Sequence, residues 1–149
     1  MKLMWQDFIN DLTIYYLYIK ETVKELFQPK PPTGTAWVKV IIAGGRDFND
    51  YKHLSEVLDH LKKPFDVVCG EAKGADSLGK RYAIEHNLKV HSFPADWDTH
   101  GKSDGYKRNE QMADFADACI AFWDGQSRGT KHMIDISTRK GLKCLVIKY

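Results

Sequence analysis

Charged and polar residues follow apolar, strand-like runs at three places in this chain, always in short glycine-containing segments. The segments are Gly44-Gly45-Arg46-Asp47, Gly70-Glu71-Ala72-Lys73-Gly74-Ala75-Asp76 and Asp124-Gly125-Gln126-Ser127-Arg128-Gly129-Thr130. Glycine lets the backbone turn tightly and approach a ligand closely, and arginine offers a planar set of donors suited to phosphate or carboxylate. The pattern therefore predicts a site for a phosphate-bearing small molecule.

The second segment has the composition of a helix start that binds an anion. Gly70, Gly74 and Ala75 keep bulky side chains away just where a helix is expected to begin, which leaves backbone N–H groups open to a phosphate. Asp76 falls in the first turn of that helix. Its carboxylate can cap the helix or accept from a ligand hydroxyl, and the sequence leaves both interpretations open.

The third segment repeats this arrangement. Ser127 and Gly129-Thr130 precede another expected helix, where the glycine N–H and the threonine hydroxyl would donate to a phosphate. Arg108-Asn109 open the preceding helix and are expected to point into the same crevice. Two helix starts that face one crevice are a more specific signal than either alone.

Apolar runs and helical patterns alternate from residue 37 onward. The strand-like runs are residues 38–43, 65–69, 89–93, 118–123 and 142–147. Continuous apolar strands alternating with helices predict an α/β fold, a Rossmann-like parallel sheet of about five strands with helices on both faces. In such sheets, ligands bind beyond the carboxyl ends of the strands, where the three glycine segments lie.

An amphipathic helix is expected to precede this domain. Residues 1–28 contain no Gly or Pro and carry apolar, largely aromatic residues at helical spacing, whereas residues 29–36 are rich in proline and predict a linker. The boundaries are therefore helix 1–28, linker 29–36 and nucleotide-binding domain 37–149. We favour packing of the helix on the domain or on its copy in a homo-oligomer. Acidic residues on its polar face weaken the alternative, an interfacial membrane helix.

Composition argues against several classes of function. The 149 residues are 43% hydrophobic, enough for one domain with a buried core. The net charge of +2 is too small to indicate the excess of positive charge typical of nucleic-acid-binding domains. Cys69, Cys119 and Cys144 lack the spacing of a zinc or redox pair, so no metal site is expected. Charges interrupt the first 28 residues, so we expect no secretion signal, no membrane span and a cytoplasmic location.

A polar loop is expected over residues 96–106, a length that is often functional. Trp97, Tyr106 and Trp123 are the aromatic candidates for stacking on a base, although aromatic residues in or near strands usually belong to the core. Trp97 is included in the expected ligand site.

The ordered motifs also carry a family resemblance. They are Gly44-Gly45-Arg46-Asp47-Phe48, Gly70-x-Ala72-x-Gly74-Ala75-Asp76, Pro94-Ala95-x-Trp97, Arg108-Asn109-x-x-Met112 and Ser127-x-Gly129-Thr130. Together they resemble the YspA-type branch of the SLOG superfamily, which groups DprA, the Lonely Guy phosphoribohydrolases and Rossmann-like domains that sense nucleotide ligands. The resemblance covers about residues 38–147 and implies a Rossmann-like fold with a nucleotide ligand.

The resemblance to Lonely Guy enzymes also implies an activity, the removal of a base from a nucleoside 5′-monophosphate. Their arginine matches Arg108, and their Gly-Thr pair matches Gly129-Thr130. Their glutamate has no counterpart, since the nearest carboxylate after Thr130 is Asp135. Glu71 and Asp76 are the candidate substitutes, so the tentative catalytic set is Asp76, Glu71 and Arg108.

Three functional hypotheses result. The first is binding of a nucleotide or nucleotide-derived small molecule, as a sensor, carrier or enzyme, with Arg46 and Arg108 supplying positive charge and with no other cofactor assigned. The second is an N-glycosidase (phosphoribohydrolase) acting on nucleoside 5′-monophosphates. The third, DprA-like nucleic-acid binding, is disfavoured by the balanced charge.

Overall fold

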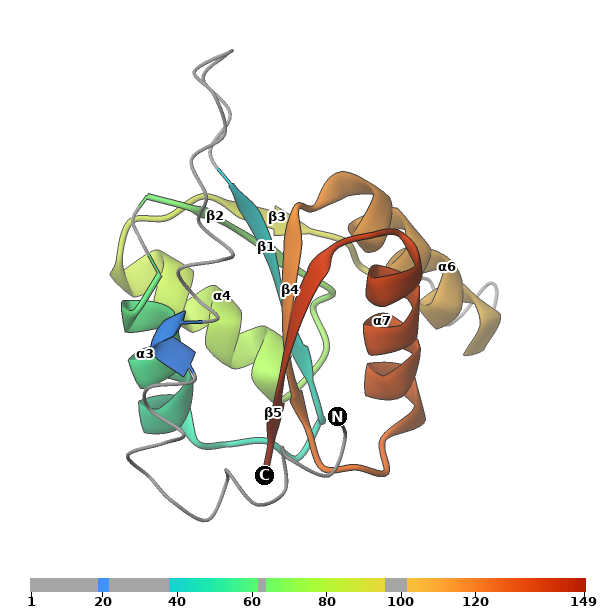
Figure 1. The fold of residues 1–149 in the computed structure, drawn as a ribbon, viewed down its shortest axis with the longest axis horizontal. Helices are drawn as coiled ribbons and strands as arrows, with labels where there is room; N and C mark the ends of the chain where they lie inside the picture. Colours follow the sequence, from blue (N-terminus) through green and yellow to red (C-terminus); the bar gives the residue numbers. More distant parts are fainter. Residues whose placement is uncertain (1–18, 22–37, 62–63, 96–101) are drawn as a thin grey trace.

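The computed structural model describes residues 19–21, 38–61, 64–95 and 102–149 (Figure 1). Within these residues, strands and helices alternate. The strands are β1 (Lys39–Gly44), β2 (Asp66–Cys69), β3 (Val90–Ser92), β4 (Ala118–Trp123) and β5 (Lys143–Lys148). The helices are α3 (Tyr51–Asp59), α4 (Ala75–Glu85), α6 (Lys102–Phe115) and α7 (Arg128–Arg139).

The five strands form one sheet in the order β3-β2-β1-β4-β5, and every neighbouring pair is parallel. The chain builds outward from β1 to β3, then returns to the other side of β1 and builds outward again. The strand order therefore reverses between β1 and β4, whose register pairs Ile42 with Ile120. The predicted Rossmann-like α/β fold is confirmed.

Helices cover both faces of the sheet, with α3 and α4 on one side and α6 and α7 on the other (Figure 1). Successive strand residues point to opposite faces, and β1 shows this directly. Val40 and Ile42 belong to the cluster under α3 and α4, whereas Ile41 and Ala43 belong to the cluster under α6 and α7. Burial on both faces explains why the strands read as continuous apolar runs.

Helix α6 begins earlier than the sequence predicts. The expected polar loop extends to residue 106, but residues 102–106 are helical. Gly105 lies in this helical part, where it is buried and lines a pocket. The glycine therefore lies within a helix instead of ending one, and Tyr106 lies on α6.

The predicted amino-terminal helix and linker lie outside the described residues, except for residues 19–21. These three residues are helical, and Ile19 is only 3% exposed, within the cluster under α3 and α4. At this residue, the segment packs on the domain. In the part of the chain that the structure describes, no helix is long and apolar enough to cross a membrane.

Candidate functional site

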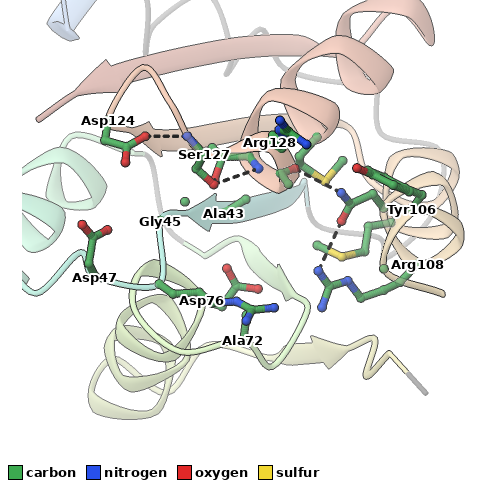
Figure 2. Close-up of a pocket in the computed structure, with 18 residues that line it drawn as sticks. Ala43, Gly45, Asp47, Ala72, Asp76, Tyr106, Arg108, Asp124, Ser127 and Arg128 are labelled. Atoms are coloured by element: carbon green, nitrogen blue, oxygen red, sulfur yellow. Dashed lines mark hydrogen bonds between the residues drawn. The ribbon is translucent and has the colours of Figure 1, made fainter. Parts of the chain in front are cut away.

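A pocket of about 500 Å³ lies at the carboxyl ends of β1 and β4, the position where ligands bind in doubly wound sheets. Its volume is within the range of small-molecule sites, roughly 300–1,000 Å³. Figure 2 shows the loop after β1 on one side, α6 on the opposite side, and the loops that precede α4 and α7 on the remaining two. All four segments carry motifs singled out from the sequence.

The floor of the pocket is apolar, because Ala43, Met112 and Met133 line it from β1, α6 and α7. They are 7%, 1% and 2% exposed and belong to one hydrophobic cluster. The rim is polar and charged, with three arginines and three aspartates: Arg46, Arg108, Arg128, Asp47, Asp76 and Asp124. A ligand with an apolar ring and polar substituents matches this division.

The first turn of α7 is open to the pocket. Ser127 caps the helix, and its hydroxyl accepts from the Thr130 N–H at 3.5 Å and lies 3.0 Å from Thr130 Oγ1. Asp124 Oδ1 accepts from Gln126 N and Ser127 N, both at 2.8 Å, and these backbone hydrogen bonds lower the pKa of that carboxyl. A Cβ placed on Gly129 would meet no atom within 4 Å. The loop is therefore fixed, and the backbone at Gly129 is accessible to a ligand.

The start of α4 is packed against the loop after β1 instead. The Ala75 N–H donates to the Gly45 carbonyl at 3.4 Å. Gly74, with φ +79°, approaches so closely that a Cβ there would lie 2.1 Å from the same oxygen. Because the first N–H of α4 already has a protein acceptor, this helix start offers less to an anion than the sequence suggests.

The backbone of Gly70 binds two charged side chains of the pocket. Its N–H donates to Asp76 Oδ2 at 2.9 Å, and its carbonyl accepts from Arg108 Nη1 at 2.7 Å. A Cβ on Gly70 would lie 2.7 Å from the Arg108 Cζ atom, so only glycine lets the guanidinium pack here without a shift. Asp76 and Arg108, which are 32 residues apart in the chain, are thus positioned by the backbone of one residue, Gly70.

Asp76 is a buried carboxylate inside the pocket wall, only 5% exposed. Burial raises its pKa from 3.8 to about 6, against the opposing effects of the Arg108 charge and of backbone hydrogen bonds at Gly70, Ala72 and Asp76. A carboxyl with this pKa exchanges its proton near neutral pH, as a general acid or base must.

Asn109 ties α6 to α7 at the edge of the site. Its Nδ2 lies 3.3 Å from the Gly129 carbonyl and 3.1 Å from His132 Nδ1, and its Oδ1 accepts from Arg108 Nη2 at 3.5 Å. The side chain is 5% exposed and lines the pocket. Asn109 therefore fixes the first turn of α7 relative to Arg108.

The opposite rim is held by the end of the chain beyond β5. The Tyr149 hydroxyl donates to Asp47 Oδ1 at 2.6 Å, and the Tyr149 ring packs edge-on against Phe48 at 4.9 Å between centroids. A Cβ on Gly45 would lie 1.9 Å from the Tyr149 hydroxyl. The absence of a side chain at Gly45 thus lets Tyr149, more than 100 residues away in the chain, pack against this loop.

Two comparisons with known proteins bear on the family. Residues 38–100 match the YAcAr family, described as the YspA, cpYpsA-related SLOG family. The Gene 61 protein of Mycobacterium phage D29 is 35% identical over 114 residues, a match that covers 70% of this chain and 91% of that protein. The chain belongs to this SLOG family. No solved structure matches it. Membership in the SLOG family supports a nucleotide-related function for this Rossmann-like domain in general terms.

Most of the SLOG site residues expected from the sequence line one pocket. They are Gly44, Gly45, Arg46, Asp76, Arg108, Asn109, Ser127, Gly129 and Thr130. Gly70, Gly74 and Ala75 support that pocket from behind, through the contacts described above. Trp97 lies outside the described residues.

The catalytic candidate Glu71 lies elsewhere, and so does Asp135, the nearest carboxylate after Thr130. Glu71 is not among the lining residues, and its side chain pairs with Lys80 at 3.2 Å on the surface. Asp135 pairs with Lys131 at 2.7 Å, also at an exposed position. Of the carboxylates proposed from the sequence, Asp76 alone lines the pocket.

The pocket also contains residues to which the sequence assigned no individual role. Asp47, Asp124 and Arg128 belong to the glycine segments that the sequence places at the site, and all three line the pocket. Met112 and Met133 also line it but could not be assigned to it from their pattern, because each reads as an ordinary core residue of an amphipathic helix.

Proposed function

We propose that the pocket binds a nucleotide or a nucleotide-derived small molecule, with its phosphate at the start of α7. The observation that carries this proposal is the open first turn of that helix, where the Gly129 backbone faces the pocket without a side chain over it. A helix start combines unpaired N–H donors with a positive dipole end. Each charge-assisted hydrogen bond to a phosphate there contributes about 1.5–3 kcal/mol.

The charges of the rim support this placement. Arg128 is the first residue of α7 and lines the pocket beside Gly129. At the start of α4, the buried Asp76 carboxylate would repel a phosphate, and the Ala75 N–H already has an acceptor. The aspartates are better suited to accept hydrogen bonds from ribose hydroxyls, so the sugar would lie between the starts of α7 and α4.

Gly129→Asp tests the proposal without disturbing the fold. The new side chain has space, and an acidic residue in the first turn stabilises a helix by about 0.3–1 kcal/mol. Its carboxylate would occupy the anion site and repel phosphate. Calorimetry with AMP, ADP, NAD and ADP-ribose should show binding to the wild type and at least a tenfold loss in Gly129→Asp. The neutral, equally large Gly129→Asn is the matched control and should keep most of the affinity. Absence of binding to the wild type at millimolar ligand would refute the proposal.

A second candidate, N-glycosidase activity on nucleoside 5′-monophosphates, is favoured by Asp76. Water would attack C1′ of the ribose while the bond to the base breaks, and the base nitrogen would take up a proton. Asp76, which lines the pocket with a pKa of about 6, would stabilise the ribosyl cation or accept the proton of the water.

Release of free base is the measurement that decides this second candidate. Wild-type protein should release base from AMP or another nucleoside monophosphate, and Asp76→Asn should lose this activity while still binding the nucleotide. Intact substrate after long incubation at high protein concentration would exclude the activity. It would leave the binding proposal in place, because binding is measured separately by calorimetry.

A further inference from the structure

Tyr106 is an aromatic side chain exposed inside the pocket. It is 45% exposed although it is a large hydrophobic residue on α6, and it lines the pocket. Figure 2 shows it on the α6 side, opposite Gly45 and Asp47 of the loop after β1. An aromatic ring that stays accessible within a binding pocket offers a flat surface on which a second ring can pack.

A second ring holds Tyr106 in place from outside the pocket. The His132 ring lies edge-on to it, with 4.4 Å between centroids and 65° between planes, and His132 is not among the lining residues. His132 Nδ1 lies 3.1 Å from Asn109 Nδ2, which can only donate, so this ring nitrogen acts as the acceptor and the imidazole is neutral there. Through this contact, His132 is anchored to the buried Asn109, and Tyr106 packs against a fixed neighbour.

The composition of the pocket leaves one place for an apolar ring. The other lining residues are glycines, Ala72 and polar or charged side chains, whereas the floor is made by Ala43, Met112 and Met133. Met112 lies on the same helix as Tyr106, and Met133 is the neighbour in sequence of His132. Tyr106 and the two methionines of the floor therefore come from the same two helices, α6 and α7.

We propose that Tyr106 is the stacking surface for the base of the nucleotide, with His132 as the residue that positions it. This inference rests on the proposed function, since it places the base at α6 while the phosphate lies at the start of α7. Sequence-tolerant stacking on an aromatic side chain accepts any base, because every base has a flat π-face. The pocket would therefore distinguish nucleotides from sugar phosphates more strongly than one base from another.

The test compares AMP with ribose 5-phosphate, which carries the same sugar and phosphate without the base. Calorimetry is performed on the full-length wild type, on Tyr106→Ala and on Tyr106→Phe, which keeps the ring. Loss of base stacking is expected to weaken AMP binding to Tyr106→Ala by about tenfold or more. Ribose 5-phosphate should bind all three proteins equally, and Tyr106→Phe should bind AMP like the wild type.

Each other outcome overturns the proposal in a distinguishable way. If Tyr106→Ala binds AMP as the wild type does, the base does not stack on Tyr106. If Tyr106→Ala binds ribose 5-phosphate as weakly, relative to the wild type, as it binds AMP, Tyr106 shapes the phosphate site and not a base site. If the wild type binds ribose 5-phosphate but not AMP, the stacking surface is refuted while the phosphate site stands. If the wild type binds neither, the proposed function fails as well.

Discussion

Replacing Asp76 by asparagine measures how much the buried carboxylate lowers the free energy of unfolding. The asparagine has the same shape, and its Oδ1 can still accept from the Gly70 N–H, as Asp76 Oδ2 does at 2.9 Å. The substitution therefore removes the buried charge while it leaves the loop between β2 and α4 in place. In the wild type, this charge lies in a side chain that is only 5% exposed.

The magnitude follows from the pKa of Asp76, which burial raises from 3.8 to about 6. The folded state then binds the proton more tightly than the unfolded state, so the stability from this group is complete below pH 4 and is lost as the pH rises toward 6 and above. Because one pKa unit corresponds to about 1.4 kcal/mol, ionisation of Asp76 lowers the free energy of unfolding by about 3 kcal/mol at neutral pH, relative to the protonated carboxyl. At pH 4.5 the same calculation gives a loss of about 1 kcal/mol.

Urea denaturation of the wild type and Asp76→Asn near pH 4.5 and near pH 7.5 checks this. The variant should be more stable at both values, with an advantage that grows by about 2 kcal/mol at the higher pH. Comparing the two proteins at each pH cancels the titration of all other groups. An advantage that does not change with pH, or a variant less stable than the wild type at pH 7.5, would refute the reasoning about Asp76.

Two further substitutions test the packing behind the pocket. Gly74→Ala should destabilise the fold by several kcal/mol, because its φ is +79° and its Cβ would lie 2.1 Å from the Gly45 carbonyl oxygen. Gly141→Ala is the matched control: its φ is +82° but no atom lies within 4 Å, so urea denaturation should show a loss of only about 1 kcal/mol. Equal losses would show that the approach of Gly74 to Gly45 is unimportant. Tyr149→Phe removes the hydrogen bond to Asp47 and keeps the ring, so we expect a loss of about 1 kcal/mol by the same method; an unchanged stability would mean that this bond contributes nothing.

Much of the fold was predictable because it depends on local patterns. The apolar runs of the strands are continuous since both faces of the sheet are covered, and helical spacing separates them. The start of α6 was predicted four residues too late, because glycine is typical of a turn. The structure instead places Gly105 inside the helix, where it is buried and lines the pocket.

The location of the site was predictable for a similar reason. The carboxyl ends of parallel strands lie at one edge of a sheet, so polar segments that follow the strands must lie near each other. Gly45, Arg108 and Gly129 were expected at the site on this basis, and all three line the pocket.

The individual contacts were not predictable from the sequence. Arg108 packs on Gly70 although 38 residues separate them, and Tyr149 bonds to Asp47 across 102 residues. Such partners depend on loop geometry and side-chain direction, which composition and periodicity do not record. The same limit left Asp76 with two interpretations. The start of α4 has no side-chain cap, so the capping interpretation is wrong. The carboxylate instead accepts from the Gly70 N–H and lies in the pocket wall, where contact with a ligand stays a prediction.

The central claim, that the pocket holds a nucleotide with its phosphate at the start of α7, is tested most directly by an NMR titration with AMP that follows backbone amide signals. The account predicts that the largest shifts on saturation belong to Arg128 and Gly129, because the N–H groups of these first two residues of α7 would meet the phosphate. Signals of Gly74 and Ala75 should change much less. Shifts centred on Gly74 and Ala75, or no shifts at millimolar AMP, would contradict the claim.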